Sequence, residues 1–83
     1  MSEKDIKVRI FDMEHGLVEY ENVKTVKIVS KDYNLLIMKD YLSIIGEIDG
    51  SVEIKGEDVD LSFKSIKAFY MNNKNVFNLM IEE

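Results

Sequence analysis

Apolar and polar residues alternate over most of this chain, a pattern typical of β-strands with one buried face. The alternation is strict in residues 6–10 and again in residues 59–64. Polar or glycine-containing clusters interrupt it at residues 14–16, 21–22, 31–34, 56–58 and 72–75. Turn signals at intervals of roughly 8–12 residues are the signature of a sandwich or barrel. The pattern predicts a small antiparallel β-sandwich or flattened barrel of eight or nine short strands.

The dipeptide Asp49-Gly50 is the sharpest turn signal in the chain. It lies between two apolar runs, residues 44–48 and 52–54. An Asp-Gly pair accepts the positive φ angles of a type I′ turn, which is the tightest connection between antiparallel strands. We therefore predict a two-residue β-hairpin turn at Asp49-Gly50.

Residues 35–48 fit two kinds of secondary structure. Leu35, Met38, Leu42 and Ile45 follow a helical spacing, while residues 35–38 and 42–48 also fit two short buried strands. Periodicity does not separate these interpretations for short apolar runs. The isoleucines of the segment, with Gly46 inside the pattern, favour strands. A helix here would make the protein an α+β domain.

The chain of 83 residues has the length of one domain. We assign residues 1–5 to a disordered lead-in and residues 6–83 to a single β-sandwich domain. Cysteine is absent, which excludes a disulfide frame and a cysteine-based zinc site. No apolar run approaches the ~20 residues of a membrane span, and no signal-peptide pattern opens the chain. These features predict a cytoplasmic protein that does not insert into membranes.

The formal net charge is −5, with 16 acidic residues against 11 lysines and arginines. Nucleic-acid binders usually carry a basic face, because neutralised phosphates supply much of their affinity. An acidic balance mostly promotes solubility. The charge therefore argues against nucleic acid and against anionic membranes as partners.

Few residues of the chain are suited to catalysis or metal binding. His15 is the single histidine and lies in a Glu-His-Gly turn, where a solvated side chain is the ordinary outcome. The carboxylates Glu57, Asp58 and Asp60 match no calcium-loop spacing. The four glycines are dispersed, so no phosphate-binding loop exists. We predict no enzyme activity, no metal and no cofactor. The alternative is a small ligand-binding or enzymatic domain with a pocket between the sheets.

The order of these segments resembles the N-terminal β-sandwich of the epsilon subunit of rotary F-type ATP synthases. The resemblance covers nearly the whole chain and rests on pattern. Its parts are an opening hairpin through Glu14-His15-Gly16, the strand at residues 23–28, the buried strand after Asp32, the segment at residues 44–54 and an Asn-rich turn before Val76. In that family the domain is not catalytic and docks against the central rotor stalk and the membrane ring. The resemblance thus implies a protein-interaction module, with a rotor-stalk component as one form of it.

The last hairpin carries apolar side chains on both faces. Such a hairpin is either central between two layers or half of an exposed contact surface. We predict that Phe69, Met71, Phe77 and Leu79 face a protein partner. ATP synthase rotor subunits and a second copy of the chain are the candidate partners.

Overall fold

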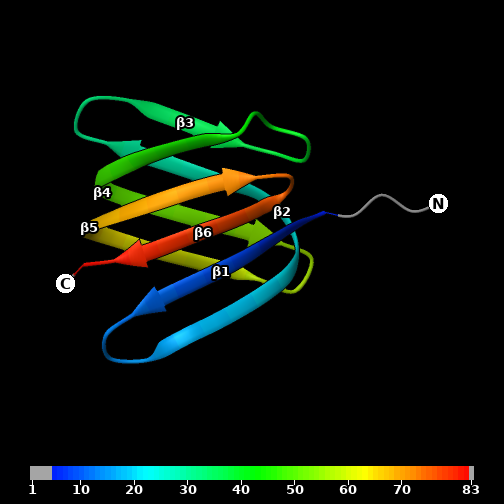
Figure 1. The fold of residues 1–83 in the computed structure, drawn as a ribbon, viewed down its shortest axis with the longest axis horizontal. Helices are drawn as coiled ribbons and strands as arrows, with labels where there is room; N and C mark the ends of the chain where they lie inside the picture. Colours follow the sequence, from blue (N-terminus) through cyan, green and yellow to red (C-terminus); the bar gives the residue numbers. More distant parts are fainter. Residues whose placement is uncertain (1–4, 83) are drawn as a thin grey trace.

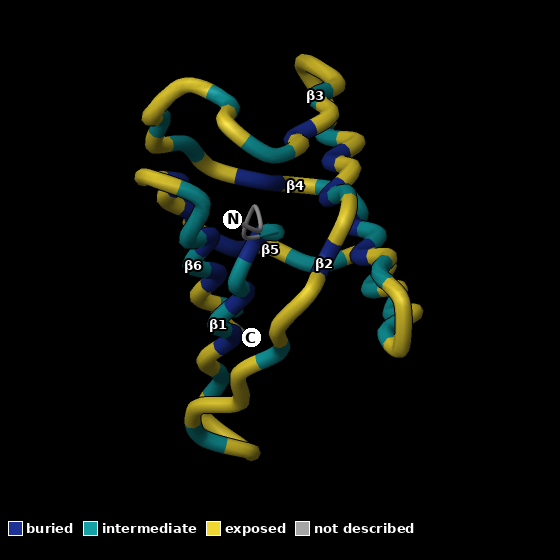
Figure 2. The backbone as a smooth tube through the Cα atoms, turned by 90° about the vertical axis from the view of Figure 1, so that its right-hand side faces the viewer, coloured by how far each residue is buried: buried dark blue, intermediate teal, exposed yellow. Residues whose placement is uncertain are grey.

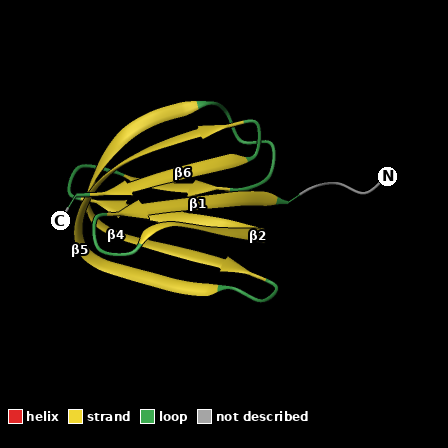
Figure 3. Cartoon of the chain, turned by 60° about the horizontal axis from the view of Figure 1, so that its bottom comes forward, coloured by secondary structure: helices red, strands yellow, loops and turns green. Residues whose placement is uncertain are grey.

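The structure is a computed structural model that describes residues 5–82, and β-strands form most of it (Figures 1 and 3). Within that range there are six strands and no helix: β1 (Ile6–Asp12), β2 (Gly16–Ser30), β3 (Asn34–Ile37), β4 (Ile44–Gly56), β5 (Asp60–Asn73) and β6 (Val76–Ile81). The predicted all-β class is confirmed. Of the predicted lead-in, only Asp5 is described, and its carboxylate lies 2.9 Å from Lys24 Nζ. Residues 1–4 lie outside the described residues.

The strands close into a five-stranded barrel. Their order is β1-β6-β5-β4-β2, and β1 also pairs with β2, so the ring is complete. β3 is an additional strand on the free side of the second half of β2. β1 and β6 run parallel, whereas the other pairs are antiparallel as predicted. A parallel pair needs a long connection between its strands. Here the rest of the chain supplies it, because β1 is the first strand and β6 the last.

The predicted count of eight or nine short strands is wrong, because three strands are long. β2, β4 and β5 span 15, 13 and 14 residues. The strand break expected at Glu21-Asn22 is a β-bulge, where pairing shifts register without ending the strand, and a second bulge lies near Ser65 in β5. Asn22 and Ser65 take positive φ angles of 61° and 56° at these points. β2 and β5 continue past these points, and their second halves pair with other strands of the barrel wall.

The predicted hairpin turn at Asp49-Gly50 is also wrong. Both residues lie inside β4, where Asp49 pairs with Lys67 and Gly50 pairs with Ile66 and with Ser30. Glycine is needed here for a different reason, since a Cβ at Gly50 would collide with the carbonyl oxygen of Val29. The residue permits a close approach of β2 and β4 and makes no turn.

The ambiguous segment at residues 35–48 contains no helix, so the interpretation as two strands joined by a loop is confirmed and the helical one is wrong. Its first part forms β3 and its last part begins β4. The loop between them is held to the β5–β6 hairpin. The Asp40 N–H donates to Asn75 Oδ1 at 2.6 Å, and Asn72 Nδ2 donates to the Leu42 carbonyl at 3.0 Å. These bonds fix the point at which β4 starts.

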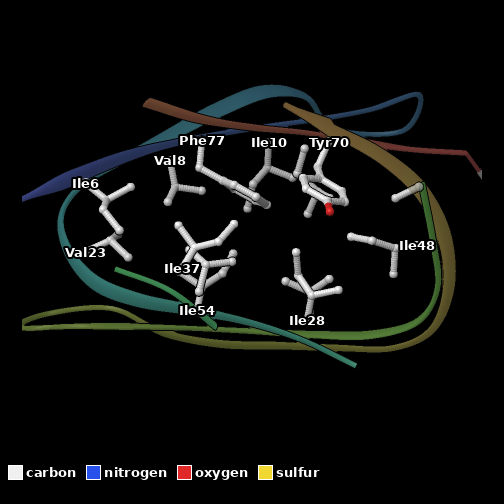
Figure 4. Close-up of a cluster of buried hydrophobic side chains, with 14 residues drawn as sticks. Ile6, Val8, Ile10, Val23, Ile28, Ile37, Ile48, Ile54, Tyr70 and Phe77 are labelled. Carbon is white, nitrogen blue, oxygen red and sulfur yellow. The ribbon is translucent and has the colours of Figure 1, made fainter. Parts of the chain in front are cut away.

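The core lies between two facing walls of the flattened barrel (Figure 4). In that view Phe77 and Val8 lie on one side, and Ile28 and Ile54 on the other. Phe77 stacks on Tyr70 with ring centroids 5.7 Å apart. The buried apolar residues are Ile6, Val8, Ile10, Val23, Val26, Ile28, Ile37, Ile48, Val52, Ile54, Ala68, Tyr70, Phe77 and Leu79. They come from all six strands, so the core depends on closure of the whole barrel.

Candidate protein-binding surface

The outer surface of β1, β5 and β6 carries large apolar side chains where an ordinary barrel surface is polar. Strand side chains alternate between the two faces of a sheet. Val8 and Ile10 of β1 are buried, so Arg9 and Phe11 face outward. By the same alternation Phe69 and Met71 of β5 face outward, because Ala68 and Tyr70 face the core.

Cross-strand register aligns four of these outward residues in one row. Leu17 on β2 pairs with Phe11 on β1. Phe11 pairs with Met80 on β6, and Met80 pairs with Phe69 on β5. Directly opposite residues in neighbouring strands have their Cβ atoms about 5 Å apart. The row is therefore continuous across four strands.

A second row runs beside the first and extends it to β4. Arg9 pairs with Asn78, Asn78 with Met71, and Met71 with Ile45. Ile45 is 75% exposed, which is unusual for a residue of its kind. The apolar members of the two rows form the outer patch, defined as Phe11, Leu17, Ile45, Phe69, Met71 and Met80. These side chains, with Arg9 and Asn78, line a shallow hollow of about 480 Å³.

The size of the outer patch sets it apart from scattered surface hydrophobics. Its six side chains are between 41% and 75% exposed. At about 200 Å² for a fully exposed side chain of this size, they present roughly 600 Å² of apolar surface. The largest patch on a typical monomer covers about 300–600 Å² and often has a function. The outer patch stands at the top of that range.

The charges at the margin of the outer patch are already paired. Arg9 Nε lies 3.0 Å from Glu19 Oε2, and Lys7 Nζ lies 3.7 Å from Glu19 Oε1. These exposed pairs contribute little to stability, about 0–1 kcal/mol. Because Arg9 is paired with Glu19, the positive charge beside the hollow is partly neutralised. The surface therefore suits an apolar partner better than an anionic one.

The four residues predicted to face a partner divide between the two sides of the barrel wall. Phe69 and Met71 are outside and belong to the outer patch, at 41% and 43% exposure. Phe77 and Leu79 are inside with no exposed surface, so the prediction is corrected for these two residues. Of the outward residues of β6, Met80 is the one that belongs to the apolar outer patch, and Asn78 lies beside it in the hollow.

Sequence reasoning missed four members of the outer patch: Phe11, Leu17, Ile45 and Met80. A signal was present for Phe11, because it follows Lys7 and Arg9 at the outward positions of a strictly alternating strand. An apolar residue at such a position departs from the ordinary polar exterior. Ile45 carried no comparable signal, because its segment also fitted a helix.

The Tyr70 ring lies in the core, and its hydroxyl contacts the loop between β2 and β3. Its ring is 3% exposed, and its hydroxyl lies 3.1 Å from the Tyr33 hydroxyl. Tyr33 donates to the Glu47 carbonyl oxygen at 2.6 Å. These contacts hold the loop at residues 31–33 against β4, close to the margin of the outer patch.

Burial raises the pKa of the Tyr70 hydroxyl, and the contact with Tyr33 raises this pKa further. The folded-state pKa then exceeds the unfolded value of about 10. This contribution to stability is fully present below about pH 10 and is lost as the pH rises toward the folded pKa. We expect Tyr70→Phe to lose less thermal stability between pH 8 and pH 11 than the wild type, as measured by the Tm at both pH values. Equal losses in the two proteins would contradict this assignment.

Asp12 and His15, which could in principle take part in catalysis or metal binding, stabilise the turn between β1 and β2. Asp12 Oδ1 accepts the backbone N–H groups of Glu14 and His15 at 2.8 and 2.6 Å. These bonds lower the pKa of the Asp12 carboxyl, with the His15 backbone N–H as the main cause. His15 Nδ1 lies 3.2 Å from the same carboxylate. Among residues 5–82, no three His, Cys, Asp or Glu side chains are placed to hold a metal ion.

The fold is similar to that of a chain from the central stalk and c-ring of the Tetrahymena thermophila mitochondrial ATP synthase. The TM-score is 0.76, and the alignment covers 100% of this chain and 67% of that chain, at 9% sequence identity. No protein-family model and no curated protein sequence matches the chain.

The structural similarity confirms part of the resemblance predicted from sequence. It is a likeness of fold to a chain of an ATP synthase central stalk and c-ring and does not single out the epsilon subunit. In the described residues, no helix is long and apolar enough to cross a membrane.

Proposed function

We propose that this chain is a non-catalytic, cytoplasmic protein-interaction module that docks on the rotor stalk of an ATP synthase-type assembly through the outer patch. Two observations support the proposal. The fold is similar to that of a chain from an ATP synthase central stalk and c-ring. The barrel also presents a continuous apolar surface over five neighbouring strands. The second observation carries the argument, because a fold alone does not determine a function.

The chemistry of the outer patch favours a folded protein as its partner. The core of a protein–protein interface is enriched in aromatic residues, methionine and arginine and depleted of other charges. The outer patch has this composition, with two phenylalanines, two methionines and Arg9 beside the hollow. A standard interface buries about 800 Å² per partner. The apolar patch of roughly 600 Å² would provide the centre of such an interface, with Asn78 and the Arg9–Glu19 pair at its margin.

The test is purification of the tagged chain from its native cells, with mass spectrometry of the proteins that accompany it. We expect ATP synthase central-stalk or c-ring subunits with the wild type. Phe69→Asp with Met80→Asp is expected to reduce their recovery at least about tenfold, because central interface side chains often contribute ~2 kcal/mol or more. Both residues lie outside the core, so the double variant is expected to remain folded.

A matched control is available on β3. Leu36 is 47% exposed and lies outside the outer patch. Leu36→Asp changes a similar apolar surface in the same way and is expected to leave recovery unchanged. If Leu36→Asp reduced the recovery of rotor subunits as much as the double variant, the outer patch would not be the binding surface. Recovery of other proteins without rotor subunits would overturn the rotor assignment.

A further inference from the structure

A second apolar opening lies on the inner side of the hairpin that supplies Phe11 and Leu17 to the outer patch. Residues 16–22 of β2 pair with β1 alone, since the pairing with β4 begins at Val23. Residues 60–66 of β5 pair with β4 alone, since the pairing with β6 begins at Ala68. These two half-strands therefore form open edges of the two facing walls. The β1–β2 hairpin reaches the bottom of the molecule, where most of its residues are exposed (Figures 1 and 2).

A slot of about 290 Å³ opens between these walls. Ile10, Val18 and Tyr20 line one side and Leu61 and Phe63 line the other. All five belong to the inner faces of their strands, but Val18 is 38% exposed, and Tyr20, Leu61 and Phe63 are half-buried. The interior of the barrel is therefore incompletely covered at this end. An apolar molecule in the slot would remove these side chains from water.

One end of the slot is polar and carries a negative charge. Asp12 and His15 line it there, on the turn between β1 and β2. Asp12 Oδ1 is occupied by two backbone N–H groups, whereas Asp12 Oδ2 has the His15 ring as its neighbour. An oxygen of the carboxylate thus remains able to accept a further donor. The slot combines an apolar body with an anionic end.

We propose that this slot binds a small organic cation, a primary amine carried on an aryl or alkyl body. The apolar walls take the body, and the Asp12 carboxylate pairs with the ammonium group. Most small-molecule sites have this composition, with apolar walls and a few polar groups that fix orientation. The volume is near the lower limit of such sites, about 300 Å³, and suits a molecule of one ring and a short chain. The net charge of −5 also favours a cation over an anion.

The experiment compares two compounds with the same body and opposite charge, 4-phenylbutylamine and 4-phenylbutyrate. Each is titrated into the ¹⁵N-labelled protein at pH 8. With the amine we expect saturable amide shifts centred on Val18, Tyr20, Leu61 and Phe63. Phenylbutyrate is expected to bind at least about tenfold more weakly, since it places a carboxylate beside Asp12.

Two variants test separately how the charge and the volume of the slot contribute to amine binding. Asp12→Asn retains an oxygen that accepts the turn N–H groups and removes the charge, so amine affinity is expected to fall about fivefold to tenfold. Val18→Phe, at a position that is already 38% exposed, is expected to fill the slot and abolish the shifts while the spectrum remains dispersed. The proposal is overturned by equal binding of the two compounds, by shifts centred on the outer patch, or by no saturable shift.

Discussion

Phe77→Ala is expected to lower the free energy of unfolding by about 3–5 kcal/mol, the range for removal of a fully buried phenylalanine ring. Phe77 is 0% exposed and is the largest fully buried side chain among the described residues. Its ring stacks on Tyr70 within the core. Removal leaves a cavity that the surrounding strands of a closed barrel fill only in part. Urea denaturation followed by circular dichroism measures the loss.

Phe69→Ala is the matched control, because Phe69 belongs to the same hairpin and lies outside the barrel at 41% exposure. We expect it to lower the free energy of unfolding by about 1 kcal/mol. The pair distinguishes core from surface at two phenylalanines that the sequence does not tell apart. Similar losses in the two variants would contradict the placement of Phe77 inside and Phe69 outside.

Gly50→Asn is expected to lower the free energy of unfolding by about 3 kcal/mol or more. A Cβ at this position would collide with the Val29 carbonyl oxygen and lie 3.1 Å from Ser30 Cα. Both are backbone atoms of the neighbouring strand, so the strain is relieved only by moving β2 away from β4. The same substitution would be tolerated if Gly50 lay in a tight turn, because asparagine adopts positive φ readily.

Gly16→Asn supplies the comparison at a true turn position. Gly16 has φ +74° and no atom near the place a Cβ would occupy. We expect this variant to change the free energy of unfolding by about 0.5 kcal/mol or less. Thermal melts of the two asparagine variants beside the wild type are sufficient. Equal stability of the Gly50 and Gly16 variants would show that β2 and β4 do not approach as closely as described.

The elements predicted correctly from sequence are those that local chemistry determines. Alternation at Ile6, Val8 and Ile10 identifies a strand because side-chain direction in a strand repeats every two residues. The asparagine-rich turn before Val76 is correct because asparagine tolerates the positive φ found at Asn75, 63°. Neither inference needs information from distant parts of the chain.

The errors arise where one local signal has two physical causes. Asp49-Gly50 indicates a turn when glycine is needed for its φ angle, but here glycine admits a neighbouring backbone. Asn22 marks the end of a strand in sequence, yet the strand continues through it as a bulge. In both positions the deciding contact comes from a paired strand and not from the residues adjacent in sequence.

The candidate surface likewise depends partly on local sequence and partly on contacts between distant strands. The sequence shows that the last hairpin is apolar on both faces, which places Phe69 and Met71 in a possible contact surface together with Phe77 and Leu79. It does not show which face is covered, because that depends on closure of the barrel.

By itself, then, the sequence determined the all-β class, most of the turns and the alternation that builds the core, since these follow from local backbone and side-chain preferences. The tertiary structure decided the number of strands, the parallel pairing of β1 with β6 and the side of the wall on which each apolar residue lies. It also brought Phe11, Leu17, Ile45 and Met80 into one surface, from segments separated by most of the chain. The physical reason is that strand register and barrel closure are contacts between distant residues, and alternation along one strand carries no information about its neighbour.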